Sequence, residues 1–188
     1  YRTARYVLLG NIAPELQLHV LDQVESPDFI VADTMDLWIN ISHEKLLEMV
    51  SRVDMLMLND SEARLLTDKY HLRSCAEAIL AMGPRYVVIK KGEHGAMLFG
   101  PDGLFIIPAY PVEAVTDPTG AGDTFAGAMI GHLAQNGGVT DEALRAALLH
   151  GAVVASHGVE AFSLDRLIQL TPADISGRAS ELRKMLAI

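Results

Sequence analysis

The sequence has a single cysteine and no local excess of positive charge. Cys75 alone cannot form a disulfide within the chain or a cysteine-based zinc site, so a reducing cytosol is the expected compartment. Lys and Arg number 15 against 24 Asp and Glu, which gives a net charge of -9, and no run of Lys or Arg occurs. We therefore expect neither a nucleic acid nor an anionic membrane as a partner.

Long apolar runs are also absent. No stretch approaches the ~18 residues of a membrane-spanning helix, although 50% of the 188 residues are hydrophobic and can supply the core of one domain. The sequence begins Tyr1-Arg2-Thr3, without an initiator Met or the pattern of a signal peptide. We expect a piece of a longer cytoplasmic protein.

Short runs rich in Val, Ile and Leu alternate with stretches of helical period. This alternation predicts an α/β fold with a mostly parallel central sheet. The predicted strands are 6–9, 29–33, 54–58, 86–89, 96–99 and 104–107, of which the last two form a hairpin. The predicted helices are 14–24, 44–50 with Ser42 as cap, one opening at 59–62, 74–82, 120–135, 141–156 with Thr140 as cap, 164–170 and 172–185. With no repeat or low-complexity linker, residues 1–188 are expected to form a single α/β unit.

A glycine-rich segment, Asp117-Pro-Thr-Gly-Ala-Gly-Asp-Thr-Phe-Ala-Gly127, leads from an extended stretch into a helix. The free N–H groups of a helix start carry partial positive charge, and glycines let an anion approach them. The segment lacks the Gly-Lys-Ser/Thr of the Walker loop, and Phe125 stands where the dinucleotide fingerprint needs Gly or Ala. The pattern therefore predicts an anion cradle of another kind and disfavours a dinucleotide-dependent oxidoreductase.

Asp123 indicates the chemistry of this cradle. A carboxylate in the first turn would repel a phosphate that was only bound, but it suits a hydroxyl that must lose a proton beside the phosphate it attacks. The alternative interpretation is that Asp123 complements the helix dipole and that the glycines permit close packing.

The eleven-residue segment resembles the second signature of the ribokinase-like, or phosphofructokinase-B (PfkB), carbohydrate kinases. The resemblance implies a three-layer ribokinase-like fold and ATP-dependent transfer of the γ-phosphate to a hydroxyl of a sugar or nucleoside. It implies that Asp123 is the catalytic base and that the backbone of Gly120, Ala121 and Gly122 forms the anion hole. Asp117 matches a position linked to a monovalent cation such as K⁺.

The segment from Asn59 to Glu62 resembles the Asn-x-x-Glu element of the same family. The resemblance implies that these two residues help to place Mg²⁺ and the phosphates, with Glu62 reaching the metal through water. Magnesium keeps several waters and uses few protein carboxylates. The alternative interpretation is a helix cap that satisfies free N–H groups.

Two further segments resemble the nucleotide-binding parts of the family. Lys90, Gly92 and Gly95 follow the strand that passes along ATP, where the family more often has Thr or Ser in place of Lys90. Lys90 either supplies charge to the triphosphate or is an ordinary lysine at a strand end, and the glycines either contact the nucleotide or only form a turn. His150 and Gly151 lie on a helix that would flank adenine, although a lone His on an apolar helix is often a core residue.

The resemblance covers only the later part of the family pattern. The acceptor-binding strand, the Gly-Gly segment and the β-sheet lid that the family carries do not occur after Tyr1. We expect the nucleotide-binding and catalytic part of a kinase with the N-terminal portion and lid missing; the alternative is a nucleotide-binding module without catalysis. An apolar sheet edge would then favour self-association, such as a homodimer.

Overall fold

The computed structural model describes residues 1–186, which divide into two compact units. Unit 1 contains Tyr1–Lys91 and Ala96–Ile106. Unit 2 contains Gly92–Gly95 and the chain from Ile107 onward. The sequence predicted that residues 1–188 form a single α/β unit. That prediction depends on how the two units pack together, so it stays a prediction.

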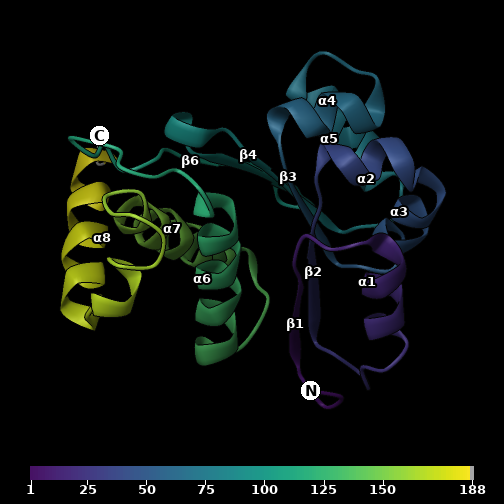
Figure 1. Cartoon of the computed structure of the whole chain (residues 1–188), viewed down its shortest axis with the longest axis horizontal. Coiled ribbons are helices and arrows are strands. Elements are labelled where there is room, and N and C mark those ends of the chain that lie inside the picture. Colours follow the sequence, from purple (N-terminus) through teal and green to yellow (C-terminus); the bar gives the residue numbers. More distant parts are fainter. Residues whose placement is uncertain (187–188) are drawn as a thin grey trace. The chain divides into compact units, whose positions relative to one another are not determined.

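The strands form one mixed sheet in the order β1-β2-β3-β4-β5-β6 (Figure 1). Neighbours from β1 to β4 pair in parallel, and β5 pairs with β4 in the antiparallel direction. This confirms the predicted α/β class, the mostly parallel sheet and the final hairpin. The strands are β1 (Tyr6–Leu9), β2 (Phe29–Asp33), β3 (Met55–Asn59), β4 (Tyr86–Lys90), β5 (Ala96–Gly100) and β6 (Gly103–Ile107).

Five helices of unit 1 gather on one side of these strands (Figure 1). Alternate strand residues such as Leu56, Leu58 and Ile89 point to that side and share one buried core with helix residues such as Leu46 and Ile79. Burying such side chains contributes about 1.5–3 kcal/mol each. The helices are α1 (Pro14–Leu21), α2 (Asp36–Ile41), α3 (His43–Val50), α4 (Asp60–Thr67) and α5 (Leu72–Leu80).

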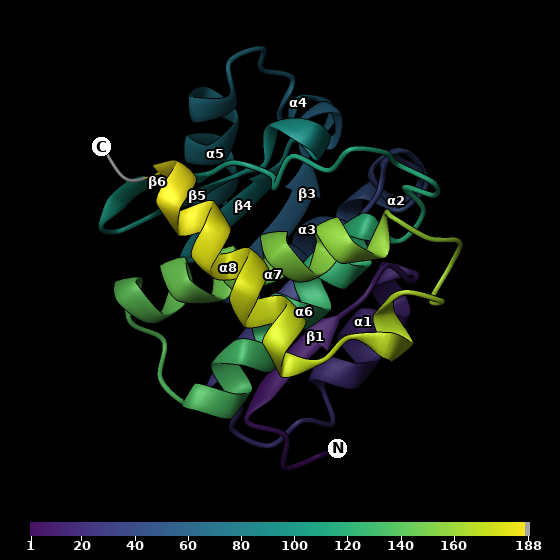
Figure 2. The ribbon, with the colours of Figure 1, turned by 90° about the vertical axis from the view of Figure 1, so that its left-hand side faces the viewer.

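Unit 2 is helical, with α6 (Ala121–Asn136), α7 (Asp141–Gly158) and α8 (Pro172–Leu186) as its main elements, preceded by the short 3-10 helix η1 (Gly92–His94). Figure 2 shows α8 crossing α7. The predicted cap of α7 is confirmed, because Thr140 Oγ1 accepts a hydrogen bond from the N–H of Ala143 at 3.2 Å. None of the helices between residues 1 and 186 has the length and apolar character of a membrane span.

Two local predictions were wrong, and one short helix was missed. The predicted helix 164–170 is only the 3-10 turn η2 (Leu167–Gln169), which Leu170 ends with extended backbone, because a seven-residue helix is costly to nucleate. Helix α2 was not predicted, since six residues are too few for a periodic pattern. Ser42 makes no side-chain cap for α3; its Oγ donates instead to Glu15 Oε1 at 2.6 Å.

Candidate functional site

The glycine-rich segment starts α6 through a residue in left-handed conformation. Gly120 is the N-cap with a φ of 74°, a conformation that favours glycine. The N–H of Ala121 donates to Pro118 O at 3.2 Å, and the N–H of Thr124 donates to Gly120 O at 2.8 Å. Among residues 1–186, no group accepts from the N–H of Gly122 or of Asp123. These two N–H groups are available to an anion.

The Asp123 side chain lies at the third position of α6 and is exposed. Within the described chain it makes no hydrogen bond and no ion pair. Its carboxylate is therefore not consumed in a structural contact, which is the state that a general base requires. The structure leaves the role of Asp123 a prediction.

Asp117 joins two loops of unit 2. Its Oδ1 accepts from the N–H of Thr119 at 3.0 Å, and its Oδ2 accepts from the N–H of Ser163 at 3.2 Å. These bonds, with the Thr119 backbone bond the largest cause, hold the pKa of Asp117 below its ordinary value. Each carboxylate oxygen of Asp117 keeps a second lone pair. The predicted contact with a monovalent cation is therefore chemically compatible with these two hydrogen bonds.

The loop after α7 is held from two sides. Its Val159 O accepts from the N–H of Thr116 at 2.8 Å, so it pairs with the segment that leads to the glycines. Arg178 of α8 donates to Glu160 Oε1 at 2.8 Å and to Ser156 Oγ at 3.0 Å. The Arg178 guanidinium also lies over the Tyr110 ring, 4.6 Å from its centroid. These contacts fix the position of the loop in which the Ser163 N–H donates to Asp117 Oδ2.

His150 lies on α7 and lines a cavity of about 470 Å³ in unit 2. Burial, and secondarily the nearby His132, lowers the pKa of His150. Most of the remaining wall is aliphatic, and it comes from α6, α7, α8 and the residues around η2: Thr124, Gly127, Ala128, Val154, Leu167, Leu170 and Ile175. A slot with apolar walls and few polar groups suits a flat heteroaromatic ring.

The glycines predicted to contact a nucleotide differ in their surroundings. A Cβ added at Gly151 would lie 2.8 Å from Phe125 O, so this glycine lets α7 approach α6 closely. A Cβ at Gly95 would lie 2.0 Å from Ile107 O, so backbone packing also requires that glycine. Gly92 has a φ of 55° and open space around it, so its backbone can be approached. Nucleotide contact by these three residues stays a prediction.

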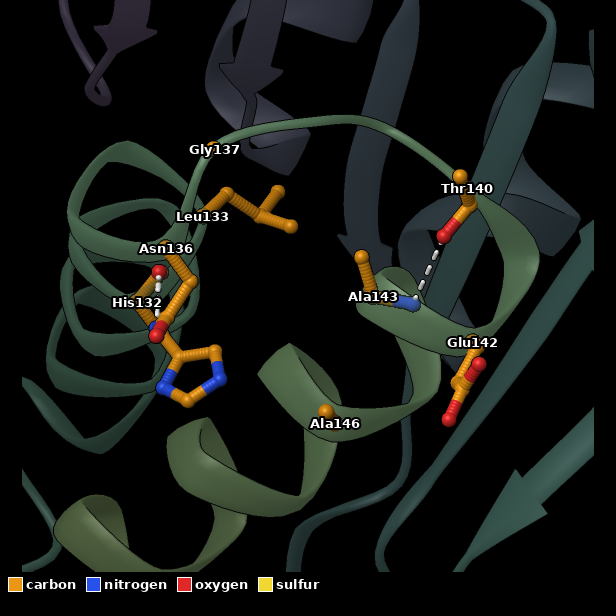
Figure 3. Close-up of a pocket in the computed structure, with 8 residues that line it drawn as sticks. All are labelled: His132, Leu133, Asn136, Gly137, Thr140, Glu142, Ala143 and Ala146. Atoms are coloured by element: carbon orange, nitrogen blue, oxygen red, sulfur yellow. Dashed lines mark hydrogen bonds between the residues drawn. The ribbon is translucent and has the colours of Figure 1, made fainter.

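A second, smaller cavity of about 270 Å³ lies where α6 ends and α7 begins (Figure 3). Its lining includes His132, whose carbonyl oxygen accepts from Asn136 Nδ2 at 2.8 Å, and Glu142 near the N-terminus of α7. The other lining residues are Leu133, Gly137, Thr140, Ala143 and Ala146. Sequence reasoning assigned no chemistry to this place.

Asn59 and Glu62 of unit 1 form a complete capping box at the start of α4. Asn59 Oδ1 accepts from the N–H of Glu62 at 2.8 Å, and Glu62 Oε2 accepts from the N–H of Asn59 at 2.7 Å. The helix-cap interpretation of this segment is therefore confirmed. Glu62 Oε1 has no hydrogen-bond partner among residues 1–186.

The electrostatic surroundings of Glu62 fit an added cation. Burial is the main cause that raises the pKa of Glu62, and the Asp33 and Asp36 charges raise it further, while the Asn59 backbone bond and Lys90 lower it. A nearby cation would favour the charged carboxylate. No group of three or more His, Cys, Asp or Glu within residues 1–186 could hold a metal. The site suits a metal held mainly by water and phosphate, as magnesium often is.

Lys90 ends β4 and forms an ion pair with Asp33, which ends β2; Nζ and Oδ2 are 2.5 Å apart. The Lys90 side chain is 17% exposed and that of Asp33 is 5% exposed. Lys90 is thus not an isolated lysine at a strand end, although its contact with a triphosphate stays a prediction. Thr34, the residue after Asp33, has a buried Oγ1 without a partner in the described chain.

Sequence reasoning missed the residues that hold these groups. Asp33 is the last residue of the predicted strand 29–33, the place where α/β sheets bind ligands, but its pairing with Lys90 was not predicted. No sequence pattern indicated the contact between Arg178 and Glu160, because Glu160 lies in a loop and Arg178 lies in a helix 18 residues later.

Comparison with known proteins shows which family this sequence matches. The sequence pattern of the pfkB family carbohydrate kinases matches residues 19–166. A cytidine kinase of Thermococcus kodakarensis is 32% identical over 136 residues, which cover 69% of this chain and 48% of the relative. A deoxyribokinase of Salmonella typhi is 33% identical over 106 residues, covering 54% of this chain and 34% of the relative. The chain thus spans about half or less of these relatives.

A solved structure agrees with the fold. Aminoimidazole riboside kinase from Salmonella enterica, complexed with aminoimidazole riboside and an ATP analog, superposes with a TM-score of 0.77 at 18% identity, covering 95% of this chain and 63% of that chain. This likeness confirms the predicted ribokinase-like fold. Because the family pattern extends over most of the sequence, from residue 19 to residue 166, the chain belongs to the pfkB family of carbohydrate kinases.

Proposed function

We propose that this chain is the nucleotide-binding and catalytic part of an ATP-dependent kinase that phosphorylates a hydroxyl of a sugar or nucleoside. Family membership supports this proposal, and so do the names of its relatives, which act on cytidine and deoxyribose. The observation that carries it is Asp123, an exposed carboxylate without a structural partner beside the available N–H groups of α6.

Asp123 is the general base of the proposed reaction. It accepts the proton of the acceptor hydroxyl, whose oxygen forms a bond to the γ-phosphorus while the bond to the β-phosphate oxygen breaks and ADP leaves. The backbone from Gly120 to Gly122 donates to the transferring phosphoryl group and stabilises its charge. The N–H of Ala121 already donates to Pro118 O, so Gly122 and the N–H of Asp123 itself supply the stronger part of this hole.

In this proposal, residues of unit 2 contact the base and the body of the nucleotide. The base occupies the apolar cavity beside His150 and Gly151, and the turn at Gly92 and Gly95 lies along the nucleotide. Lys90, oriented by Asp33, contributes positive charge to the triphosphate.

Cations complete the proposed site. Asn59 and Glu62 would hold Mg²⁺, with Glu62 reaching it through water, and the ion would supply charge neutralisation for the phosphates. Asp117 contributes to a site for a monovalent cation such as K⁺. We place the kinase in the cytoplasm, and we infer that copies of the chain associate as a homodimer.

The proposal predicts that Asp123→Asn lowers turnover by about 100-fold or more and leaves ATP affinity nearly unchanged, because the amide cannot accept the proton but keeps the shape of the site. Phosphate transfer to pentoses, hexoses and nucleosides, with ATP affinity from calorimetry, would measure both quantities. Asp141→Asn is the matched control, since Asp141 lies in the first turn of α7 and pairs with Arg145.

Two results would contradict this assignment in different ways. Equal losses of ATP affinity and turnover in Asp123→Asn would assign that residue a structural role. ATP binding by the wild-type chain without transfer to any acceptor would instead favour a nucleotide-binding module without catalysis.

A further inference from the structure

Two histidines from different helices of unit 2 pack ring against ring. The centroids of His132 on α6 and His150 on α7 lie 4.8 Å apart, and the ring planes meet at 33°. Aromatic rings at this separation attract each other beyond the effect of the apolar area that they bury. The contact fixes the position of one ring relative to the other.

The ring pair links the two cavities of the unit. His150 lines the 470 Å³ cavity, whereas His132 lines the 270 Å³ cavity in Figure 3. On α6, His132 comes one helical turn after Ala128, which belongs to the wall of the larger cavity. His132 therefore contacts the one imidazole that lines the larger cavity.

Little else restrains the His150 ring. No hydrogen bond to either of its nitrogens is present among residues 1–186, so packing alone sets its rotamer. A histidine side chain has two rotatable bonds, and ordering it on binding costs free energy. Contact with the tilted His132 ring removes part of that cost before a ligand arrives.

Charge also matters to this contact. Burial lowers the pKa of both histidines, and the second causes are Arg183 of α8 for His132 and His132 itself for His150. Glu142 of α7 is the charged residue that lines the smaller cavity with His132, and no charged residue lines the larger one. The lowered pKa of each ring favours its neutral form, and protonating either one would place a cation against its neighbour.

We propose that His132 is a positioning residue, which holds the His150 ring against the heteroaromatic base of a nucleoside triphosphate in the larger cavity. This inference rests on the proposed function, because it takes the larger cavity as the place of the base. A neutral imidazole offers the base one donor and one acceptor, and the aliphatic wall of the cavity contacts the ring faces.

The test compares a ligand that has a base with one that lacks it. Calorimetry with Mg-ATP and with Mg-tripolyphosphate would be run on the wild type, His132→Ala and His132→Phe, with His19→Ala on α1 as an exposed-histidine control. We expect His132→Ala to weaken ATP about 3- to 10-fold, from the range for an aromatic pair, and to leave tripolyphosphate unchanged.

The phenylalanine variant and pH provide a second readout. His132→Phe keeps the ring contact without a titratable group, so it should bind ATP like the wild type at pH 7.5 and lose less affinity than the wild type at pH 5.5. If His132→Ala fails to fold, the pH profile of His132→Phe still decides the question.

The results that would contradict this inference differ in which proposal they overturn. Unchanged ATP affinity in His132→Ala, or an equal loss for ATP and tripolyphosphate, would overturn the positioning role alone. A wild-type chain that binds neither ligand would overturn the proposed function and this inference with it.

Discussion

At the scale of single residues, the Asp33–Lys90 pair places two charges where little water reaches them. Removing the lysine would leave the Asp33 carboxylate, 5% exposed, without its partner. We predict that Lys90→Met lowers the free energy of unfolding by about 3 kcal/mol, measured by urea denaturation.

The double variant provides the control for this prediction. Asp33→Asn combined with Lys90→Met removes both charges, so it should recover most of the stability that the single variant loses. Single and double variants of equal stability would show that the two side chains do not stabilise each other.

Residues whose roles are local were predictable, and residues whose roles depend on distant partners were not. Asn59 and Glu62 lie three positions apart, so a capping box could be considered from the sequence. Asp33 and Lys90 lie 57 positions apart on β2 and β4, with β3 between them. Only the strand order brings their side chains together.

At the scale of elements, the packing of α6 on α7 depends on a glycine. An alanine at position 151 would place its Cβ 2.8 Å from the backbone oxygen of Phe125, which cannot rotate away. We predict that Gly151→Ala lowers the free energy of unfolding by about 1–3 kcal/mol, because the helices must separate. Urea or thermal unfolding would measure the loss.

Gly131→Ala on α6 is the matched control. No atom lies within 4 Å of a Cβ at that position, so the alanine should stabilise the helix by about 0.5–1 kcal/mol. Stabilisation by both substitutions would contradict the close approach of the two helices.

The longer elements were predictable because their apolar periods extend over several turns or fill a strand, as in α6, α7 and β4. The errors came where the pattern was short. The segment 164–170 has leucines at helical spacing, yet seven residues are too few to nucleate a stable helix, and Leu170 has an extended ψ of 131°. The anion cradle and the role of Asp123 were predicted from one contiguous segment and stay predictions, while the loop contacts of Asp117 and Arg178 need tertiary structure.

At the scale of the whole molecule, three histidines make folding sensitive to acid. Burial is the largest cause that lowers the pKa of His132, His150 and His157 below the ordinary value of 6.5. Since the unfolded chain binds protons more strongly at these positions, unfolding takes up protons as the pH falls below about 6.5. We predict a decrease in the free energy of unfolding between pH 7.5 and pH 5.5, measured by urea denaturation.

His157 offers a variant that checks this cause. Both of its ring nitrogens are buried without a hydrogen bond among residues 1–186, and Nδ1 lies 3.5 Å from Glu160 Oε2. His157→Gln should therefore reduce the acid sensitivity. Glu62, whose pKa is raised, acts in the opposite direction at lower pH. Stability that stays constant or rises from pH 7.5 to pH 5.5 would contradict the prediction.

The division into two units limits where the polypeptide can be divided into fragments that keep each unit intact. The polypeptide changes unit after Lys91, after Gly95 and after Ile106. A fragment ending at Lys91 would lose β5 and leave β4 with an unpaired edge, while one beginning at Ile107 would lose the four residues Gly92–Gly95. Fusion junctions and circular permutations should therefore keep the β4–β6 segment continuous.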